Sequence, residues 1–146
     1  MKLILIIVAI VISPGARACS CKDLGTKETL RQYAAVFSGQ VMDVRYVDAL
    51  TRESPRVIVT FHVLQSWKGE VGPEIVMHTR RRGVDNCEGL LAEDLGVGKK
   101  MLIFGYYHSP KDWNFQKVLA TGVCSRTQPL AEAAEDILVL GPARKR

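Results

Sequence analysis

The spacing of apolar residues is helical in one early segment of the chain and alternating over most of the residues after it. The segment TKETLRQYAAVF carries Leu30, Tyr33 and Ala34 at helical spacing, which predicts a short helix over residues 27–35. The stretch RVIVTFHVLQSWKG, residues 56–69, is the clearest strand, because its alternate residues are apolar and would share one face. The chain is therefore expected to pass from a helix into β structure.

The remaining apolar segments predict four more strands and a closing helix. The strand segments are VFSGQVMDVRYV (36–47), PEIVMHT (73–79), KKMLIFGYY (99–107) and FQKVLATG (115–122). Gly39 inside the first of them predicts a bend or bulge, and the polar segment 48–55 predicts a hairpin loop. The closing helix is predicted over PLAEAAEDILVL, with Pro129 in its first turn and Gly141 after its end. This order predicts a mainly β fold, a five-stranded OB-fold-like barrel with flanking short helices.

The first 18 residues have the three parts of a secretory signal peptide. Lys2 gives a positive start, Leu3–Ile12 is an unbroken run of ten apolar residues, and Ala16-Arg17-Ala18 places small residues before a cleavage point. A membrane span needs about 20 apolar residues, so a membrane anchor is the weaker hypothesis. We predict that residues 1–18 are removed. Residues 19–146 would form one domain that is secreted, extracellular or periplasmic, and does not span the membrane.

The charge of the mature chain is modest. Without Lys2 and Arg17, 18 of the 20 basic residues remain against 15 acidic ones, a formal net charge of +3. Binding to single strands also needs aromatic side chains interleaved with basic ones, and aromatic residues make up only 7% of the chain. Nucleic acid is therefore not expected as a partner. The run Arg80, Arg81 and Arg82 can bind sulfated glycans, although such a run is more often solvated surface.

No pattern inside the chain indicates an enzyme or a cofactor. His62, His78 and His108 lie far apart and lack the spacing of zinc ligands. The segment GVGKK (96–100) lacks the Lys-Ser/Thr and the following helix of a phosphate loop. We expect a protein that is not an enzyme and carries neither a metal nor a cofactor of its own.

All four cysteines, Cys19, Cys21, Cys87 and Cys124, lie after the predicted cleavage point. An even number of cysteines in an exported chain predicts a disulfide framework. A bridge between Cys19 and Cys21 is unfavourable, because one intervening residue strains its geometry. Two pairings remain open, and each ties the start of the domain to its middle and its end. The spacing of Cys19 and Cys21 also differs from that of redox dithiols, which usually have two intervening residues.

Cleavage after Ala18 would give Cys19 a free α-amine. That nitrogen and the carbonyl oxygen of the same residue can chelate one metal ion in a five-membered ring. The fitting target is a catalytic zinc ion with an open coordination position. The amine must lose its proton to bind zinc, so affinity should rise with pH. Disulfides that hold this end rigid would reduce the ordering cost of binding.

Several of these segments resemble the N-terminal, netrin-like domain of the tissue inhibitors of metalloproteinases. The matching pieces occur in the family's order: Cys19-Ser20-Cys21 after the signal peptide, VFSGQV, FHVLQSWKG, HT followed by Cys87, GKKMLIFGYY and TGVCSRTQPLAEA. The resemblance implies an OB-type barrel with the bridges Cys19–Cys87 and Cys21–Cys124. It also implies an inhibitory ridge in which Cys19 binds the target's catalytic zinc and Ser20 points into the specificity pocket. The full ridge would be Cys19, Ser20, Cys21, Lys22, Asp85, Asn86, Cys87 and Glu88.

The sequence also departs from this family. The cysteines of the animal inhibitors' third bridge have no counterpart here, nor does their six-cysteine C-terminal domain, and the loop 48–55 is short. The first prediction is a secreted inhibitor of zinc metalloendopeptidases. The alternative is a secreted netrin-like module that binds a protein or a glycan, without inhibiting a protease. A third hypothesis is a lipid-anchored envelope protein acylated at Cys19, although Arg17 fits a lipid-attachment site poorly.

Overall fold

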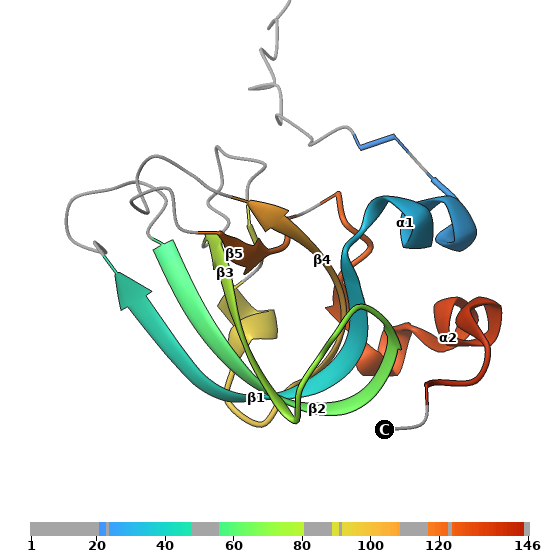
Figure 1. Ribbon diagram of the computed structural model, residues 1–146. Coiled ribbons are helices and arrows are strands. Elements are labelled where there is room, and N and C mark those ends of the chain that lie inside the picture. Colours follow the sequence, from blue (N-terminus) through green and yellow to red (C-terminus); the bar gives the residue numbers. More distant parts are fainter. Residues whose placement is uncertain are drawn as a thin grey trace, which may run out of the picture.

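Six strands and two α-helices form the part of the chain that the computed structural model describes (Figure 1). The described residues are 21–22, 24–47, 56–80, 89–90, 92–108, 117–122 and 124–144. The strands are β1 (Ala35–Val47), β2 (Arg56–Lys68), β3 (Glu74–Arg80), β4 (Lys100–His108), β5 (Val118–Ala120) and β6 (Gln128–Pro129). The helices are α1 (Thr26–Gln32) and α2 (Ala134–Leu140), with 3-10 turns η1 (Ala92–Leu95) and η3 (Leu130–Glu132). The predicted mainly β fold with two short flanking helices is confirmed.

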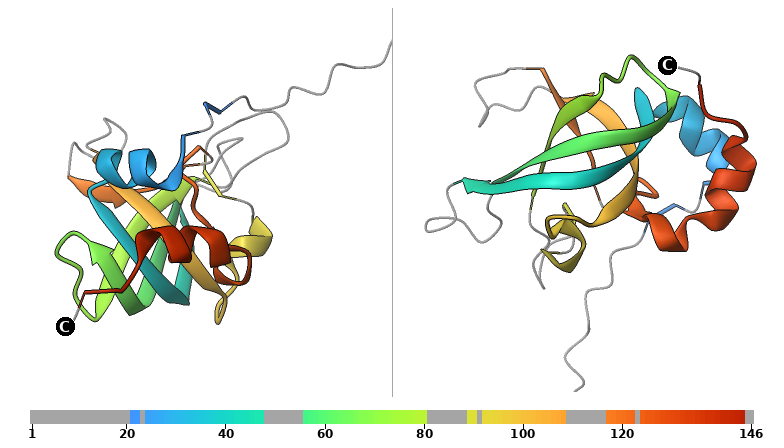
Figure 2. Two further views of the ribbon diagram at one scale, coloured as in Figure 1. Left: turned by 90° about the vertical axis from the view of Figure 1, so that its right-hand side faces the viewer. Right: turned by 90° about the horizontal axis from the view of Figure 1, so that it is seen from below.

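Five of these strands are paired in a closed ring. β1 pairs with β2, β2 with β3, β3 with β5, β5 with β4, and β4 returns to β1. The β3–β5 pair is parallel and the others are antiparallel. The short β6 pairs with the start of β4. Figures 1 and 2 show α1 and α2 beside each other on one outer side of the ring.

β1 bends strongly, because its pairing with β2 shifts register at three places. One shift falls between Ser38 and Gly39, which confirms the predicted irregularity at Gly39. A Cβ at Gly39 would lie 3.1 Å from the Cβ of Phe61 and 3.3 Å from the carbonyl oxygen of His62. The missing side chain thus lets the two strands approach closely. The bend allows residues 36–40 to pair with β4 as well as with β2.

The strands separate two apolar layers, because successive side chains point to opposite faces of a sheet. The inner layer fills the ring and includes Phe37, Val41, Val57, Val59, Phe61, Met77, Leu95, Met101 and Ile103. The outer layer lies between the ring and the helices and includes Val36, Trp67, Leu102, Phe104 and Ala133, packed against Leu30, Tyr33, Leu130 and Ile137. The outer layer therefore holds α1 and α2 against the ring.

The helix boundaries differ from the predictions. α1 ends at Gln32 rather than at residue 35, because Tyr33 already has an extended backbone. The prediction that the closing helix begins at Pro129 is wrong: Pro129 is extended and lies opposite Met101 in β6. A 3-10 turn comes next, and α2 starts only at Ala134. Within the described ranges, neither helix has the length or the apolar composition that crossing a bilayer requires.

Candidate functional site

The predicted inhibitory ridge is only partly visible. Cys21 and Lys22 are described, and both are exposed. The other predicted ridge residues lie outside the described residues: Cys19, Ser20, Asp85, Asn86, Cys87 and Glu88. The predicted bridge Cys19–Cys87 lies outside them too, as do Arg81 and Arg82. The described residues include contacts at Cys21 and Leu24, and at Arg80, Gly89 and Leu90, which are near the predicted ridge residues in the sequence.

The bridge Cys21–Cys124 is present, with the two Cα atoms 5.3 Å apart. It joins residues 103 positions apart in the sequence. Cys21 precedes α1, and Cys124 lies in the turn between β5 and β6. In the chain-entropy account, closing a loop of that size stabilises the fold by about 4–5 kcal/mol. The bridge fastens the chain before α1 to the turn between β5 and β6.

Buried hydroxyl groups support the turn that carries Cys124. Thr121 Oγ1 donates to the carbonyl oxygen of Phe104 at 2.9 Å and lies 2.7 Å from both Ser125 Oγ and Thr127 Oγ1. Thr79 Oγ1 near the end of β3 donates to the carbonyl oxygen of Thr121 at 3.2 Å. These bonds tie the Cys124 turn to both β4 and β3. The turn is thus fixed to the ring by side-chain hydrogen bonds.

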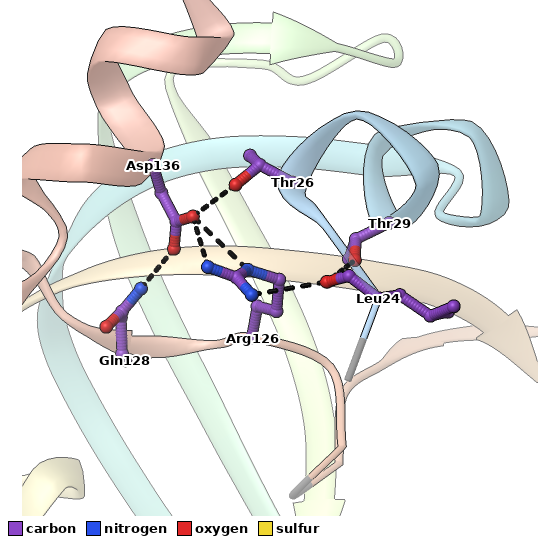
Figure 3. A network of polar contacts seen from close by, with 6 residues as sticks. All are labelled: Leu24, Thr26, Thr29, Arg126, Gln128 and Asp136. Atoms are coloured by element: carbon purple, nitrogen blue, oxygen red, sulfur yellow. Dashed lines mark hydrogen bonds and ion pairs between the residues drawn. The ribbon is translucent and has the colours of Figure 1, made fainter. Parts of the chain in front are cut away.

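On its other side, the turn is joined to both helices through Asp136 (Figure 3). The Asp136 carboxylate is buried, with 2% of the residue exposed. Its Oδ1 accepts a hydrogen bond from Thr26 Oγ1 at 2.5 Å and forms an ion pair with the guanidinium of Arg126 at 2.6 Å. Its Oδ2 accepts a hydrogen bond from Gln128 Nε2. A buried carboxylate is tolerated because a cation and two further donors surround it.

Arg126 also reaches the chain just before α1. Its guanidinium donates to the carbonyl oxygen of Leu24 at 3.2 Å, and Thr29 Oγ1 donates to the same oxygen at 3.3 Å. Leu24 lies three residues after Cys21 in the sequence. The chain just before α1 is therefore attached twice to the 124–126 turn, by the disulfide at Cys21 and by the hydrogen bond from Arg126 to Leu24. We call residues 24, 26, 29, 126, 128 and 136, drawn in Figure 3, the Asp136 network.

The described residues on either side of segment 81–88, which contains the other predicted ridge residues, lie close together. The amide of Leu90 donates to the carbonyl oxygen of Arg80 at 3.0 Å. Gly89 has φ +81, and a Cβ there would lie 1.7 Å from that same oxygen. Thr79, next to Arg80, bonds to Thr121. The base of this loop is thereby joined to the ring close to the Cys124 turn.

The sheet formed by β1, β2 and β3 carries a group of basic residues. Arg56 lies opposite Arg80 in the β2–β3 pair, and Arg45 and His78 lie on either side of Ile58. Partial burial, followed by the nearby charges of Arg56 and Arg45, lowers the pKa of His78 below its ordinary value of 6.5. Two arginines are thus close enough to His78 to disfavour its protonation. The sequence runs on from Arg80 into Arg81 and Arg82.

The described part of the chain contains no group of three or more His, Cys, Asp or Glu side chains arranged to hold a metal ion. His62, His78 and His108 lie on β2, β3 and β4 respectively. The histidines are thus distributed over different strands.

Comparison with models of known protein families found no matching family, and a search of curated protein sequences found no match. The residues and their geometry are therefore the basis of the functional proposal.

The sequence pattern missed Arg126 and Asp136. The signal for Asp136 was present, because Ala133, Asp136, Ile137 and Leu140 fall at the spacing of one helix face. A carboxylate on an otherwise apolar face requires buried donors, and a cation is the strongest of them. No pattern in the sequence identifies Arg126 as that cation.

Proposed function

We propose that the mature chain is a secreted inhibitor of zinc metalloendopeptidases. The proposal takes residues 1–18 as a signal peptide and residues 19–146 as one netrin-like domain. It also takes the five-stranded ring as an OB-type barrel, like that of the tissue inhibitors of metalloproteinases. The chain acts by binding and is not an enzyme.

In the proposed mechanism, Cys19 is the first residue of the mature chain. Its α-amine nitrogen and its carbonyl oxygen bind the catalytic zinc ion of the target peptidase, at the position that water otherwise occupies. Ser20 enters the specificity pocket beside that zinc. The bridge Cys19–Cys87 brings Asp85, Asn86, Cys87 and Glu88 alongside as the second half of the ridge.

One observation carries the proposal: the chain that comes after Cys19 is attached twice to the ring within four residues. The disulfide at Cys21 and the hydrogen bond from Arg126 to Leu24 both lead to the 124–126 turn. An exposed chain end normally loses considerable conformational entropy when it binds. An end that is already held needs to lose less, and this favours its insertion into an active-site cleft.

The base of the loop 81–88 gives independent support. Its ends are tied by the Leu90–Arg80 hydrogen bond and by the contact of Gly89 with Arg80. Thr79 then links the end of β3 to Thr121, and the Cys124 turn lies immediately beyond. Both halves of the proposed ridge therefore start from one connected region of the ring.

The test is inhibition by proteins that differ only at the first residue. Protein that begins at Cys19 is compared with protein that carries one added alanine, across a panel of zinc metalloendopeptidases. The Cys19 form should inhibit at least one of them, and the extended form should not, while circular dichroism shows the same fold. Equal inhibition by both forms, or none by either at micromolar concentration, would overturn the proposal.

A second candidate function is binding of a sulfated glycan to the basic residues of β1–β3. It is favoured by the placement of Arg56 opposite Arg80 and of Arg45 and His78 on either side of Ile58, which gathers positive charge that attracts polyanions. After the larger effect of burial, the charges of Arg56 and Arg45 also lower the pKa of His78. Salt-sensitive retention on heparin resin, weakened in Arg56→Ala but not in Arg31→Ala on α1, would support it. Such retention without peptidase inhibition would favour the binding module over the inhibitor.

A further inference from the structure

We infer that Arg126 is a positioning residue that sets the direction of the inhibitory N-terminus, and this inference rests on the proposed function. Arg126 touches neither the peptidase nor its zinc in this scheme. It acts through the carbonyl oxygen of Leu24, between the ring and the segment that ends at Cys19.

The disulfide alone does not define a direction. A Cys21–Cys124 bridge holds one point of the chain, and the chain on either side can turn about the bonds of the two side chains. A second attachment three residues away fixes the orientation of the segment between the two points. The guanidinium of Arg126 provides this second attachment, at Leu24. Arg126 itself lies only two residues after Cys124 in the chain.

The backbone at Arg126 is unusual in a way that serves this role. Arg126 has φ +57, and among the described residues no other residue except glycine has a positive φ. This conformation costs about 1–2 kcal/mol in a residue with a side chain. It allows Ser125 to point its hydroxyl toward Thr121 while Arg126 points toward Asp136 and Leu24. Such strain is retained where neighbouring contacts require it.

Arginine fits this position better than lysine. Nε and one terminal nitrogen of Arg126 donate to Asp136 Oδ1, at 3.2 and 2.6 Å, while the other terminal nitrogen donates to Leu24. A planar guanidinium can serve both acceptors at once, whereas an ammonium group is a single point of charge. Asp136 in turn bonds to Thr26 in the first turn of α1. Arg126 and Asp136 together therefore hold Leu24 and the first residue of α1, Thr26, in one geometry.

A purely structural role makes a different prediction from a positioning role. If Arg126 mattered only through the stability of the fold, Arg126→Gly would be milder than Arg126→Ala in every readout, because both remove the guanidinium and only glycine removes the backbone strain. If Arg126 positions the N-terminus, Arg126→Gly and Arg126→Ala should increase the mobility of residues 21–25 equally, because both remove the hydrogen bond to Leu24. This should hold although the glycine variant is the more stable of the two. Arg126→Lys should keep residues 21–25 only partly ordered.

Two variants complete the design. Asp136→Asn keeps an acceptor for Thr26 but removes the charge that holds the guanidinium, so it should release the segment as well. The control is Trp67→Phe, which removes the hydrogen bond from Trp67 Nε1 to the carbonyl oxygen of Gly141 at the far end of α2. It weakens the same helix without touching Leu24.

The experiment has two readouts on the mature protein. Backbone ¹⁵N relaxation should give order parameters of about 0.85 at residues 21–25 in the unaltered protein, falling below about 0.6 in Arg126→Gly and Arg126→Ala but not in Trp67→Phe. The inhibition constant should rise by about tenfold or more in the same variants. Unchanged order parameters in Arg126→Gly, or an equal fall in Trp67→Phe, would overturn the inference. If the unaltered protein inhibits no peptidase, the proposed function fails, and the relaxation data still decide whether Arg126 holds the segment.

Discussion

Gly89 packs directly on the backbone of Arg80. A Cβ at position 89 would lie 1.7 Å from the carbonyl oxygen of Arg80 and 2.4 Å from its carbonyl carbon, and the backbone of Gly89 is left-handed with φ +81. These atoms belong to the strand end and cannot move aside as a flexible side chain can. The two ends of the loop 81–88 meet closely because residue 89 has no side chain.

Gly89→Ala should therefore lower the free energy of unfolding by about 3 kcal/mol or more, through overpacking and backbone strain together. The matched control is Gly98→Ala, since Gly98 also has a positive φ but has no atom within 4 Å of the Cβ position. The unfolding free energy of Gly98→Ala should fall by only about 1–2 kcal/mol. Urea denaturation measures both, and equal losses would contradict the packing account of Gly89.

Replacing Asp136 tests the network that joins the helices to the Cys124 turn. Asp136→Ala leaves Thr26 and Gln128 without their acceptor and Arg126 without its ion pair, so the unfolding free energy should fall by about 3 kcal/mol. This loss is at the lower end of the range expected for breaking a buried ion pair, because 33% of the Arg126 side chain is exposed to solvent. Glu135→Ala, an exposed carboxylate on the same helix, should change it by less than about 0.5 kcal/mol. A similar loss in both variants would show that the network contributes nothing specific.

His78 should make stability depend on pH in the mildly acidic range. Its pKa is lowered in the folded protein by burial and by Arg56 and Arg45, so the unfolded chain takes up the proton first as the pH falls below 6.5. Protonation then favours the unfolded state, and stability is lost as pH decreases through this range. Between pH values of about 7.5 and 5.5, urea denaturation should show a smaller loss in His78→Gln than in the unaltered protein. His62→Gln, at an exposed position on β2, should keep the full loss, and a loss that is unchanged in His78→Gln would contradict this assignment.

The disulfide Cys21–Cys124 should matter for both stability and inhibition. The double variant Cys21→Ser/Cys124→Ser avoids leaving one unpaired partner, and its unfolding free energy should fall by about 2–5 kcal/mol. Inhibition should weaken further than this loss explains under conditions where the variant is still folded, because the chain before α1 would keep its hydrogen bond at Leu24 but lose its covalent attachment to the 124–126 turn. An inhibition constant equal to that of the unaltered protein, measured on folded material, would contradict the role given to the bridge.

The strands were predictable because their alternation reflects direct contact with two apolar layers. Gly39 and Gly141 were also predictable, one as a place where strands approach and one as a helix end with φ +73. Pro129 was misassigned, because a proline before a helical pattern is compatible both with the first turn of a helix and with a short strand. In the structure Pro129 pairs with Met101 in a strand.

The Asp136 network was not predictable, since its residues come from sequence positions 110 apart and the partner of a buried charge is set by the fold. Most of the predicted ridge lies outside the described residues, so the roles of Cys19, Ser20 and residues 85–88 remain predictions. The structure adds the attachments on which those roles depend.

In the proposed mechanism, the terminal amine of Cys19 becomes a ligand of the target's zinc. The most direct measurement uses a target peptidase whose zinc is replaced by cobalt(II), because the visible absorption of cobalt responds to a change of ligand. Titration with protein that begins at Cys19 should shift the spectrum with one equivalent, and N-acetylated or alanine-extended protein should leave it unchanged. A complex that forms without any spectral shift, or an equal shift with the blocked forms, would contradict the claim.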